Sequence, residues 1–173
     1  NKLNILVEKP FVRKFSEFKT LKKISQNKKK IIHISMPFFF TYYFFYIKKY
    51  IDLNFKELIF NWHDPPNDKR YGKIKKYDPS VYYLEDTIYH IYGILNCLFG
   101  SKKMSIISIK NHKDNGLLLF NYGKFKIKLI CSRNKKSKRV RSVDILSSKK
   151  VFSLDYANDN NINIVKNGVK KKN

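Results

Sequence analysis

Residues 83–99 read YLEDTIYHIYGILNCLF, and this stretch decides the fold. Its apolar residues recur at spacings of three and four, the period of one helix face, and they are Leu84, Ile88, Ile91, Leu95 and Leu98. The opposite face carries Asp86 and His90 one turn apart, above two small residues, Gly93 and Cys97. The pattern predicts a helix that lays its apolar face on a core, presents a carboxylate and an imidazole on the other side, and ends at Gly100.

The sequence changes to strand-like alternation after Gly100. Five segments, separated by short polar joints, fit strands: 104–110, 117–121, 124–131, 139–146 and 151–156. Short joints of this kind connect neighbouring antiparallel strands, so an antiparallel meander is expected. Phe125, Ile127 and Leu129 share one face of the third strand and lysines share the other. The helix at 83–99 is therefore expected to cover the apolar face of this sheet.

The first 36 residues carry a different pattern. Two short apolar runs, at 3–7 and 31–36, fit buried strands, and residues 16–27 between them fit a helix. Strand, helix and strand within so short a span indicate a βαβ unit, which belongs in a parallel sheet. Pro37 then ends the second strand, a helix is expected over 38–51, and a further strand over 57–63 ends at Pro65.

The charge is strongly basic, with 37 Lys and Arg against 13 Asp and Glu and a net charge of +24. The lysines are scattered, and Lys, Asn, Ile, Tyr and Phe are enriched together, which favours codon bias in an AT-rich genome. The alternative is a basic nucleic-acid-binding protein whose aromatic residues, 16% of the chain, stack on bases. One lysine-rich groove with exposed aromatics would favour that alternative.

The two cysteines, Cys97 and Cys131, have no spacing typical of a metal site or a disulfide framework, so we expect no metal and a cytoplasmic protein. A second alternative is a single-span membrane protein through residues 31–47. That segment is apolar and flanked by lysines, but it is short for a span and contains His33 and Pro37. These features favour the strand that ends at Pro37.

Three ordered motifs resemble the Gfo/Idh/MocA family of NAD(P)-dependent oxidoreductases. They are Val7-Glu8-Lys9-Pro10 at a strand end, Asp86 with His90 at positions i and i+4, and an antiparallel sheet after that helix. The resemblance covers about residues 3–165 and implies hydride transfer on a sugar-like or cyclitol-like hydroxyl or carbonyl. It implies that NAD or NADP lies against Glu8, Lys9 and Pro10, and that Lys9, Asp86 and His90 are the catalytic residues.

The chemistry of this trio is consistent by itself. Oxidation of an alcohol needs a base for the hydroxyl proton, and His, with an ordinary pKa of about 6.5, suits that role. A carboxylate one turn away would orient the imidazole or raise its pKa, and a lysine would stabilise the developing alkoxide. The alternative for Asp86 and His90 is an ordinary surface pair worth a few tenths of a kcal/mol.

Four further residues are candidates for substrate binding. Residues 62–66, WHDPP, resemble the start of a substrate-side loop, which makes His63 and Asp64 candidates; the alternative is a turn that ends the strand. Arg70 and Tyr71, in the polar stretch that follows, suit a polar or anionic substrate. A small sugar-like molecule is the expected substrate.

The sequence also departs from the family pattern. It contains no Gly-x-Gly-x-x-Gly, the loop that binds the pyrophosphate of a dinucleotide, and Tyr83-Leu84-Glu85 stand where the family has a glycine pair. We therefore expect a partial oxidoreductase that by itself neither binds NAD(P) nor is active. The expected fold class is α+β: an antiparallel sheet with a helix packed on one face, preceded by a remnant βαβ of a Rossmann-type parallel sheet.

The expected division is a Rossmann remnant over 1–36, an α+β substrate and oligomerisation domain over 37–165, and a tail over 166–173. A sheet covered by a helix on one face leaves its other face open. In the family that this chain resembles such faces often mediate dimers or tetramers, so the resemblance implies a homo-oligomer through that face. The candidate contact residues are Ile107, Leu118 and Ile130.

Overall fold

The computed structural model describes residues 4–9, 11–12, 14–36, 44, 48, 55–67, 69–74, 80–133, 138–147, 150–157, 161–166 and 169–172. In this part of the chain, eight strands form one mixed sheet in the order β12-β11-β10-β9-β3-β8-β7-β6. Their bounds are β3 Glu57–His63, β6 Met104–His112, β7 Asn115–Tyr122, β8 Phe125–Ser132, β9 Val140–Leu146, β10 Lys150–Asp155, β11 Asn161–Lys166 and β12 Val169–Lys172.

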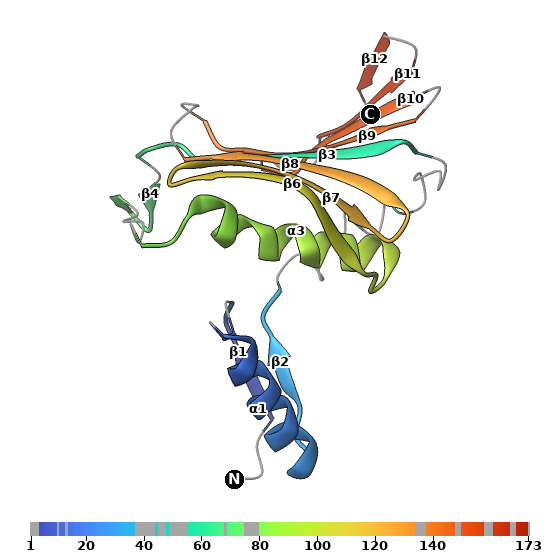
Figure 1. The fold of residues 1–173 in the computed structure, drawn as a ribbon. Coiled ribbons are helices and arrows are strands. Elements are labelled where there is room, and N and C mark those ends of the chain that lie inside the picture. The colour runs from blue at the N-terminus through green and yellow to red at the C-terminus, as the bar shows by residue number, and fades with distance from the viewer. Residues whose placement is uncertain are drawn as a thin grey trace.

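Helix α3 (Tyr83–Phe99) lies along one face of this sheet, as Figure 1 shows. Leu84, Ile91, Leu95 and Leu98 of the predicted apolar face are all buried, and Gly100 ends the helix with φ of 70°. The contact is close at Gly116 of β7, where a Cβ atom would lie 2.8 Å from Cβ of Leu84. The expected α+β fold, with a helix packed on one face of the sheet, is confirmed.

The core lies between α3 and the sheet. Leu58 and Phe60 of β3 and Ile127 and Leu129 of β8 have no exposed surface. Alternate residues of β8 are buried, as the sequence predicts. The predicted helix over 38–51 lies largely outside the described residues, but Phe44 is helical and buried, with its ring 5.4 Å from that of Tyr156.

The predicted meander is wrong at one point, because β3 lies between β8 and β9. It pairs with β8 in parallel and with β9 in antiparallel, so that Phe60 has both Leu129 and Val143 as neighbours. Alternation assigns residues to the two faces of a strand but says nothing about which strand lies alongside. The last strand, β12, pairs with β11 where the sequence predicts a tail.

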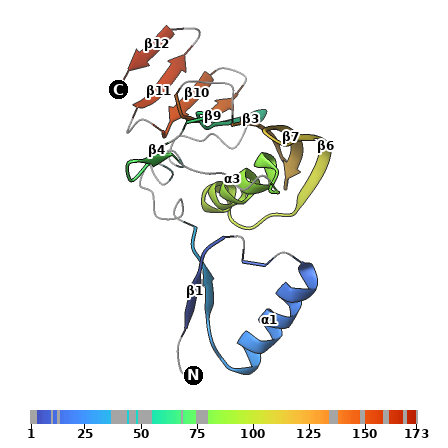
Figure 2. The same cartoon turned by 90° about the vertical axis from the view of Figure 1, so that its left-hand side faces the viewer.

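The β1-α1-β2 unit (Ile5–Val7, Phe15–Asn27, Ile32–Ile34) lies on the α3 side of the sheet, as Figures 1 and 2 show. Strands β1 and β2 pair in parallel, which confirms the βαβ unit. The prediction that both strands are buried is wrong: Leu6 is 68% exposed, His33 is exposed, and no residue of α1 is buried. One helix cannot cover both faces of a two-stranded sheet.

Within the described part of the chain, no helix has the length and apolar character needed to cross a membrane. Residues 32–34 of the alternative span are strand β2.

Exposed lysines occur on α1, on β6 and on β8, for example Lys22, Lys110 and Lys126. Several large aromatic side chains, including Phe60, Phe120 and Tyr122, lie in the core instead of on the surface.

Candidate active site

Lys9 and Asp86 form a contact between the β1-α1-β2 unit and α3. Lys9 follows β1 directly, and its Nζ lies 2.5 Å from Oδ1 of Asp86 and 3.1 Å from the Asp86 carbonyl oxygen. The two side chains are 16% and 35% exposed, so the ion pair sits at the edge of the interior. The ammonium group is therefore held at the first turn of α3.

His90 lies one turn further along α3 and packs on β3. Its ring stacks on the Trp62 indole, with centroids 5.1 Å apart and planes 10° from parallel. The Arg141 guanidinium, from β9, lies 3.9 Å from the centroid of the same tryptophan. Stacking on Trp62 fixes the plane of the His90 imidazole, one helical turn from Asp86.

The pKa of His90 is lowered to about 4, mainly because burial disfavours the imidazolium and secondly because of the nearby Lys9 ammonium. Asp86 acts in the opposite direction, and Arg141 lowers the pKa further. Asp86 does raise the pKa of His90, as expected, but the prediction of a raised pKa is wrong because burial and Lys9 together outweigh Asp86. At neutral pH the imidazole is uncharged and is able to accept a proton.

Arg141 is anchored by Asp64. Its Nη2 donates to Oδ1 of Asp64, its Nη1 donates to the carbonyl of His63 at 2.9 Å, and the Tyr83 hydroxyl donates to Oδ2 of Asp64 at 2.7 Å. Burial alone would raise the pKa of Asp64, but Arg141, Tyr83 and Arg139 hold it below its ordinary value. Burial, and secondly the same carboxylate, raises the pKa of Tyr83. This buried charged cluster fixes the guanidinium that lies on Trp62.

Two of the four candidate substrate residues, His63 and Asp64, follow Trp62 directly but have different surroundings. Asp64 is 4% exposed and occupied by Arg141, so it is a structural anchor. His63 lies on the opposite face of the sheet from Trp62, where its Nδ1 is 2.6 Å from Oγ of Ser132. Alternate residues of a strand point to opposite faces, so His63 and Trp62 face opposite ways, while Asp64 contacts Tyr83 of α3. Substrate binding by His63 and Asp64 stays a prediction.

Arg70 and Tyr71 belong to a small hairpin of β4 (Lys69–Arg70) and β5 (Lys73–Ile74). Tyr71 is at the turn, with φ of 51° and a fully exposed side chain. Of the predicted cofactor residues, Glu8 is exposed next to Lys9, and Pro10 lies outside the described residues.

Trp62 and Arg141 are the site residues that the sequence did not identify. A signal for Arg141 exists, because it alternates with the buried Val143 and Ile145 on β9, and an arginine at an inward position needs a partner. Trp62 alternates in the same way with Phe60 and Leu58. Their meeting with His90 depends on the insertion of β3 next to β9, which no local pattern shows.

Lys9 stands at the carboxyl end of a parallel strand, the edge of such sheets where dinucleotides bind, and its ammonium is directed to the residues that would act on a hydroxyl. Among the described residues there is no glycine-rich turn for a pyrophosphate. Nor do three His, Cys, Asp or Glu side chains gather in a metal-ligand cluster in this part of the chain.

Known proteins share this fold. No family model matches the chain, and no curated protein matches it in sequence. Among solved structures, a dehydrogenase (MviM) from Clostridium difficile is similar with a TM-score of 0.76 and 16% identity, over 99% of this chain and 55% of that one. UDP-N-acetylglucosamine 3-dehydrogenase GnnA from Acidithiobacillus ferrooxidans is similar with a TM-score of 0.74 and 16% identity, over 98% of this chain and 55% of that one.

An inositol dehydrogenase homolog from Azotobacter vinelandii, complexed with NADH and myo-inositol, matches with a TM-score of 0.77 and 12% identity, over 99% of this chain and 49% of that one. The fold is thus that of part of a Gfo/Idh/MocA-type dehydrogenase, and the resemblance is confirmed at the level of the fold. The chain spans about half the length of these structures.

Proposed function

We propose that Lys9, Asp86 and His90 form the substrate side of the active site of an NAD(P)-dependent oxidoreductase. The observation that carries this proposal is the meeting of Lys9 with Asp86, 77 residues apart, next to an imidazole held neutral and stacked in place. The substrate is a sugar-like or cyclitol-like alcohol or its carbonyl product. Solved structures of the same fold include proteins described as acting on or binding such molecules, which supports this substrate class.

His90 is the general base for the alcohol. Its neutral imidazole takes the hydroxyl proton while hydride leaves the carbon, and in the reverse direction it returns that proton. The Lys9 ammonium stabilises negative charge on the reacting oxygen. Asp86 holds the ammonium in place through its carboxylate and its backbone carbonyl. The main role of Asp86 is thus to position Lys9, and its effect on the pKa of His90 is secondary.

The cofactor in this proposal is NAD or NADP, with its nicotinamide next to Lys9 and Glu8. When bound, it supplies the hydride acceptor or donor. The described residues offer nothing for the pyrophosphate, so the 173-residue chain alone is expected not to bind NAD(H) with micromolar affinity. Isothermal titration tests this point separately from substrate binding.

Substrate binding is measured without the cofactor through Trp62, the single tryptophan of the chain, which stacks on His90. We expect myo-inositol or UDP-N-acetylglucosamine to change tryptophan fluorescence in a saturable way. Lys9→Met should weaken binding about tenfold or more, because a charge-assisted hydrogen bond contributes roughly 1.5–3 kcal/mol. Lys22→Met, on the exposed surface of α1, is the matched control. Equal binding by the two variants would refute the assignment of Lys9.

We also propose a cytoplasmic homo-oligomer that associates through the open face of the sheet. Both cysteines are free, as expected in a reducing compartment. Ile130 is half-buried on the open face and Ile107 on β6 is 53% exposed. Leu118, the third predicted contact, is wrong, because it is 3% exposed in the core. Sedimentation of Ile130→Lys against the parent chain tests the interface: unchanged mass would reject it.

A further inference from the structure

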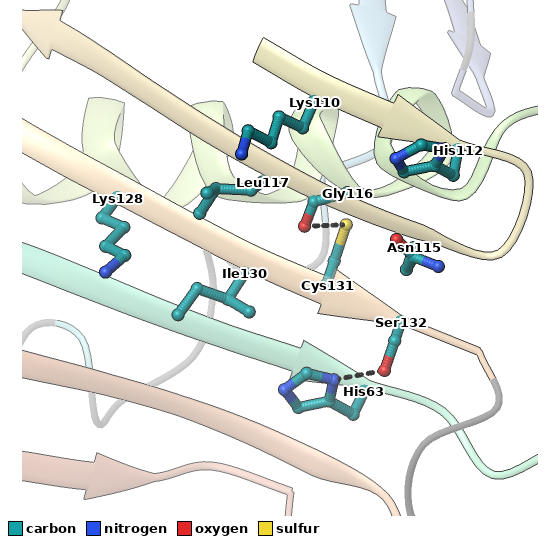
Figure 3. A pocket seen from close by; sticks show the side chains of 10 residues that line it. All are labelled: His63, Lys110, His112, Asn115, Gly116, Leu117, Lys128, Ile130, Cys131 and Ser132. Carbon is teal, nitrogen blue, oxygen red and sulfur yellow. Dashed lines mark hydrogen bonds between the residues drawn. The ribbon is translucent and has the colours of Figure 1, made fainter. Parts of the chain in front are cut away.

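A cavity of about 320 Å³ opens on the face of the sheet that α3 does not cover. It lies across β6, β7, β8 and β3, towards the carboxyl ends of β8 and β3, and Figure 3 shows its lining. The volume falls within the range of small-molecule sites, about 300–1,000 Å³. His90 and Trp62 lie on the other face, so this cavity is separate from the candidate active site.

Positive charge and apolar surface alternate in the lining. Leu117 and Ile130 are direct neighbours on β7 and β8, and Figure 3 shows them beside Lys110 and Lys128. No carboxylate lines the cavity. Within the described residues, neither lysine has an ion-pair partner. Two ammonium groups on an apolar floor attract an anion whose remainder is apolar.

The far end of the cavity is polar. Ser132 and His63 are 1% and 6% exposed, and their side chains contact each other at 2.6 Å. His112 and Asn115, which are paired across β6 and β7, complete this end. The buried pair is fixed by its own hydrogen bond and so offers a preorganised polar wall to a ligand oxygen.

We propose that this cavity binds a phosphate monoester with a flat apolar body. The doubly charged phosphate lies between Lys110 and Lys128, its body covers Leu117 and Ile130, and its oxygens reach towards the histidine end. A dianion suits two lysines better than a single carboxylate does. A bound anion also relieves the repulsion between lysines that a second copy of the chain would bring to this face.

Phenyl phosphate is the probe, and NMR of the histidine ring protons is the measurement. The chain has four histidines, of which His63 and His112 line the cavity and His33 and His90 do not. Single His→Gln variants assign the signals. We expect saturable shifts of His63 and His112 at sub-millimolar to millimolar phenyl phosphate, no matching shifts of His33 and His90, and weaker binding of inorganic phosphate by several-fold.

The double variant Lys110→Gln/Lys128→Gln should weaken binding about tenfold or more. Because Lys110 is exposed and Lys128 half-exposed, the substitutions leave the core intact. Lys126→Gln is the matched control, because Lys126 is on the same strand and face as Lys128 but opposite Glu57 and outside the cavity. If the ring-proton shifts of all four histidines rose linearly with phenyl phosphate concentration, the anion would be attracted unspecifically by the +24 net charge, and the proposal would be overturned. Equal weakening by Lys126→Gln, or equal binding of phosphate and phenyl phosphate, would also overturn it.

Discussion

The β1-α1-β2 unit and the α3-covered sheet carry similar apolar patterns and bury them very differently. In α3 the side chains of Ile91, Ile94 and Leu95 are fully buried against the sheet. In the N-terminal unit Leu6 is 68% exposed and Phe15 70% exposed. Apolar periodicity therefore shows which face of an element is able to pack, whereas burial depends on the presence of a second layer.

The two regions meet at the candidate active site. The exposed unit supplies Lys9, and the packed domain supplies Asp86, His90 and the Trp62–Arg141 stack. The packed domain therefore supplies the fixed groups, while the ammonium is held by the carboxylate and the backbone carbonyl of Asp86. Substitutions in the packed domain are therefore expected to cost more stability than substitutions in the exposed unit.

Arg141→Met should cost about 3–5 kcal/mol of unfolding free energy, because it leaves the Asp64 carboxylate buried without its main partner. Urea denaturation measures the loss. The double variant Asp64→Leu/Arg141→Met should recover most of it, since two apolar side chains replace a buried pair. A loss below about 1 kcal/mol for the single variant would show that Arg139 and Tyr83 satisfy Asp64 by themselves.

Leu95→Ala should cost about 2–5 kcal/mol, because it opens a cavity between α3 and the sheet. Leu6→Ala removes the same atoms from an exposed position in β1 and should change stability by less than about 0.5 kcal/mol. The pair is measured in one set of urea titrations. A large cost for Leu6→Ala would mean that the N-terminal unit is packed against another layer in solution.

Stability should fall by up to about 3 kcal/mol as the pH drops from about 6.5 to 4, because unfolded His90 binds a proton at about 6.5 and folded His90 only at about 4. The unfolded chain holds more protons in this window, so acid favours unfolding. Asp64, whose folded pKa lies below its ordinary value, adds its loss only at lower pH. His90→Gln should flatten the decline between pH 6.5 and 4; an unchanged slope would refute the low pKa of His90.

Lys9→Met should have only a small effect on stability, about 1 kcal/mol or less, because the Lys9–Asp86 pair is partly exposed. It should nevertheless raise the pKa of His90, since the Lys9 ammonium is the second largest cause of the lowering. NMR titration of the His90 ring protons measures this shift. Lys22→Met should leave it unchanged, and an equal pKa in Lys9→Met and the parent chain would contradict the proposed role of Lys9.

Much of the site and fold could be predicted from particular residues. The spacing of Leu84, Ile91 and Leu95 predicts α3 and its buried face, and alternation predicts the bounds of β6 to β10 to within two residues. Lys9, Asp86 and His90 were selected through resemblance, and the structure places them together. Substrate binding by His63 and Asp64 stays a prediction, and a turn-like WHDPP stretch does not show which face each side chain takes.

The sequence by itself determined the helix and the faces of the strands, because helix and strand periods follow from local backbone geometry. The candidate trio came from the resemblance to a known family. Only the tertiary structure decided that β3 lies between β8 and β9, that Trp62 is shared by His90 and Arg141, and that Lys9 reaches Asp86. These depend on contacts between residues far apart in the chain. The pKa of His90 follows from the same contacts, since burial and neighbouring charge exist only once the chain is folded.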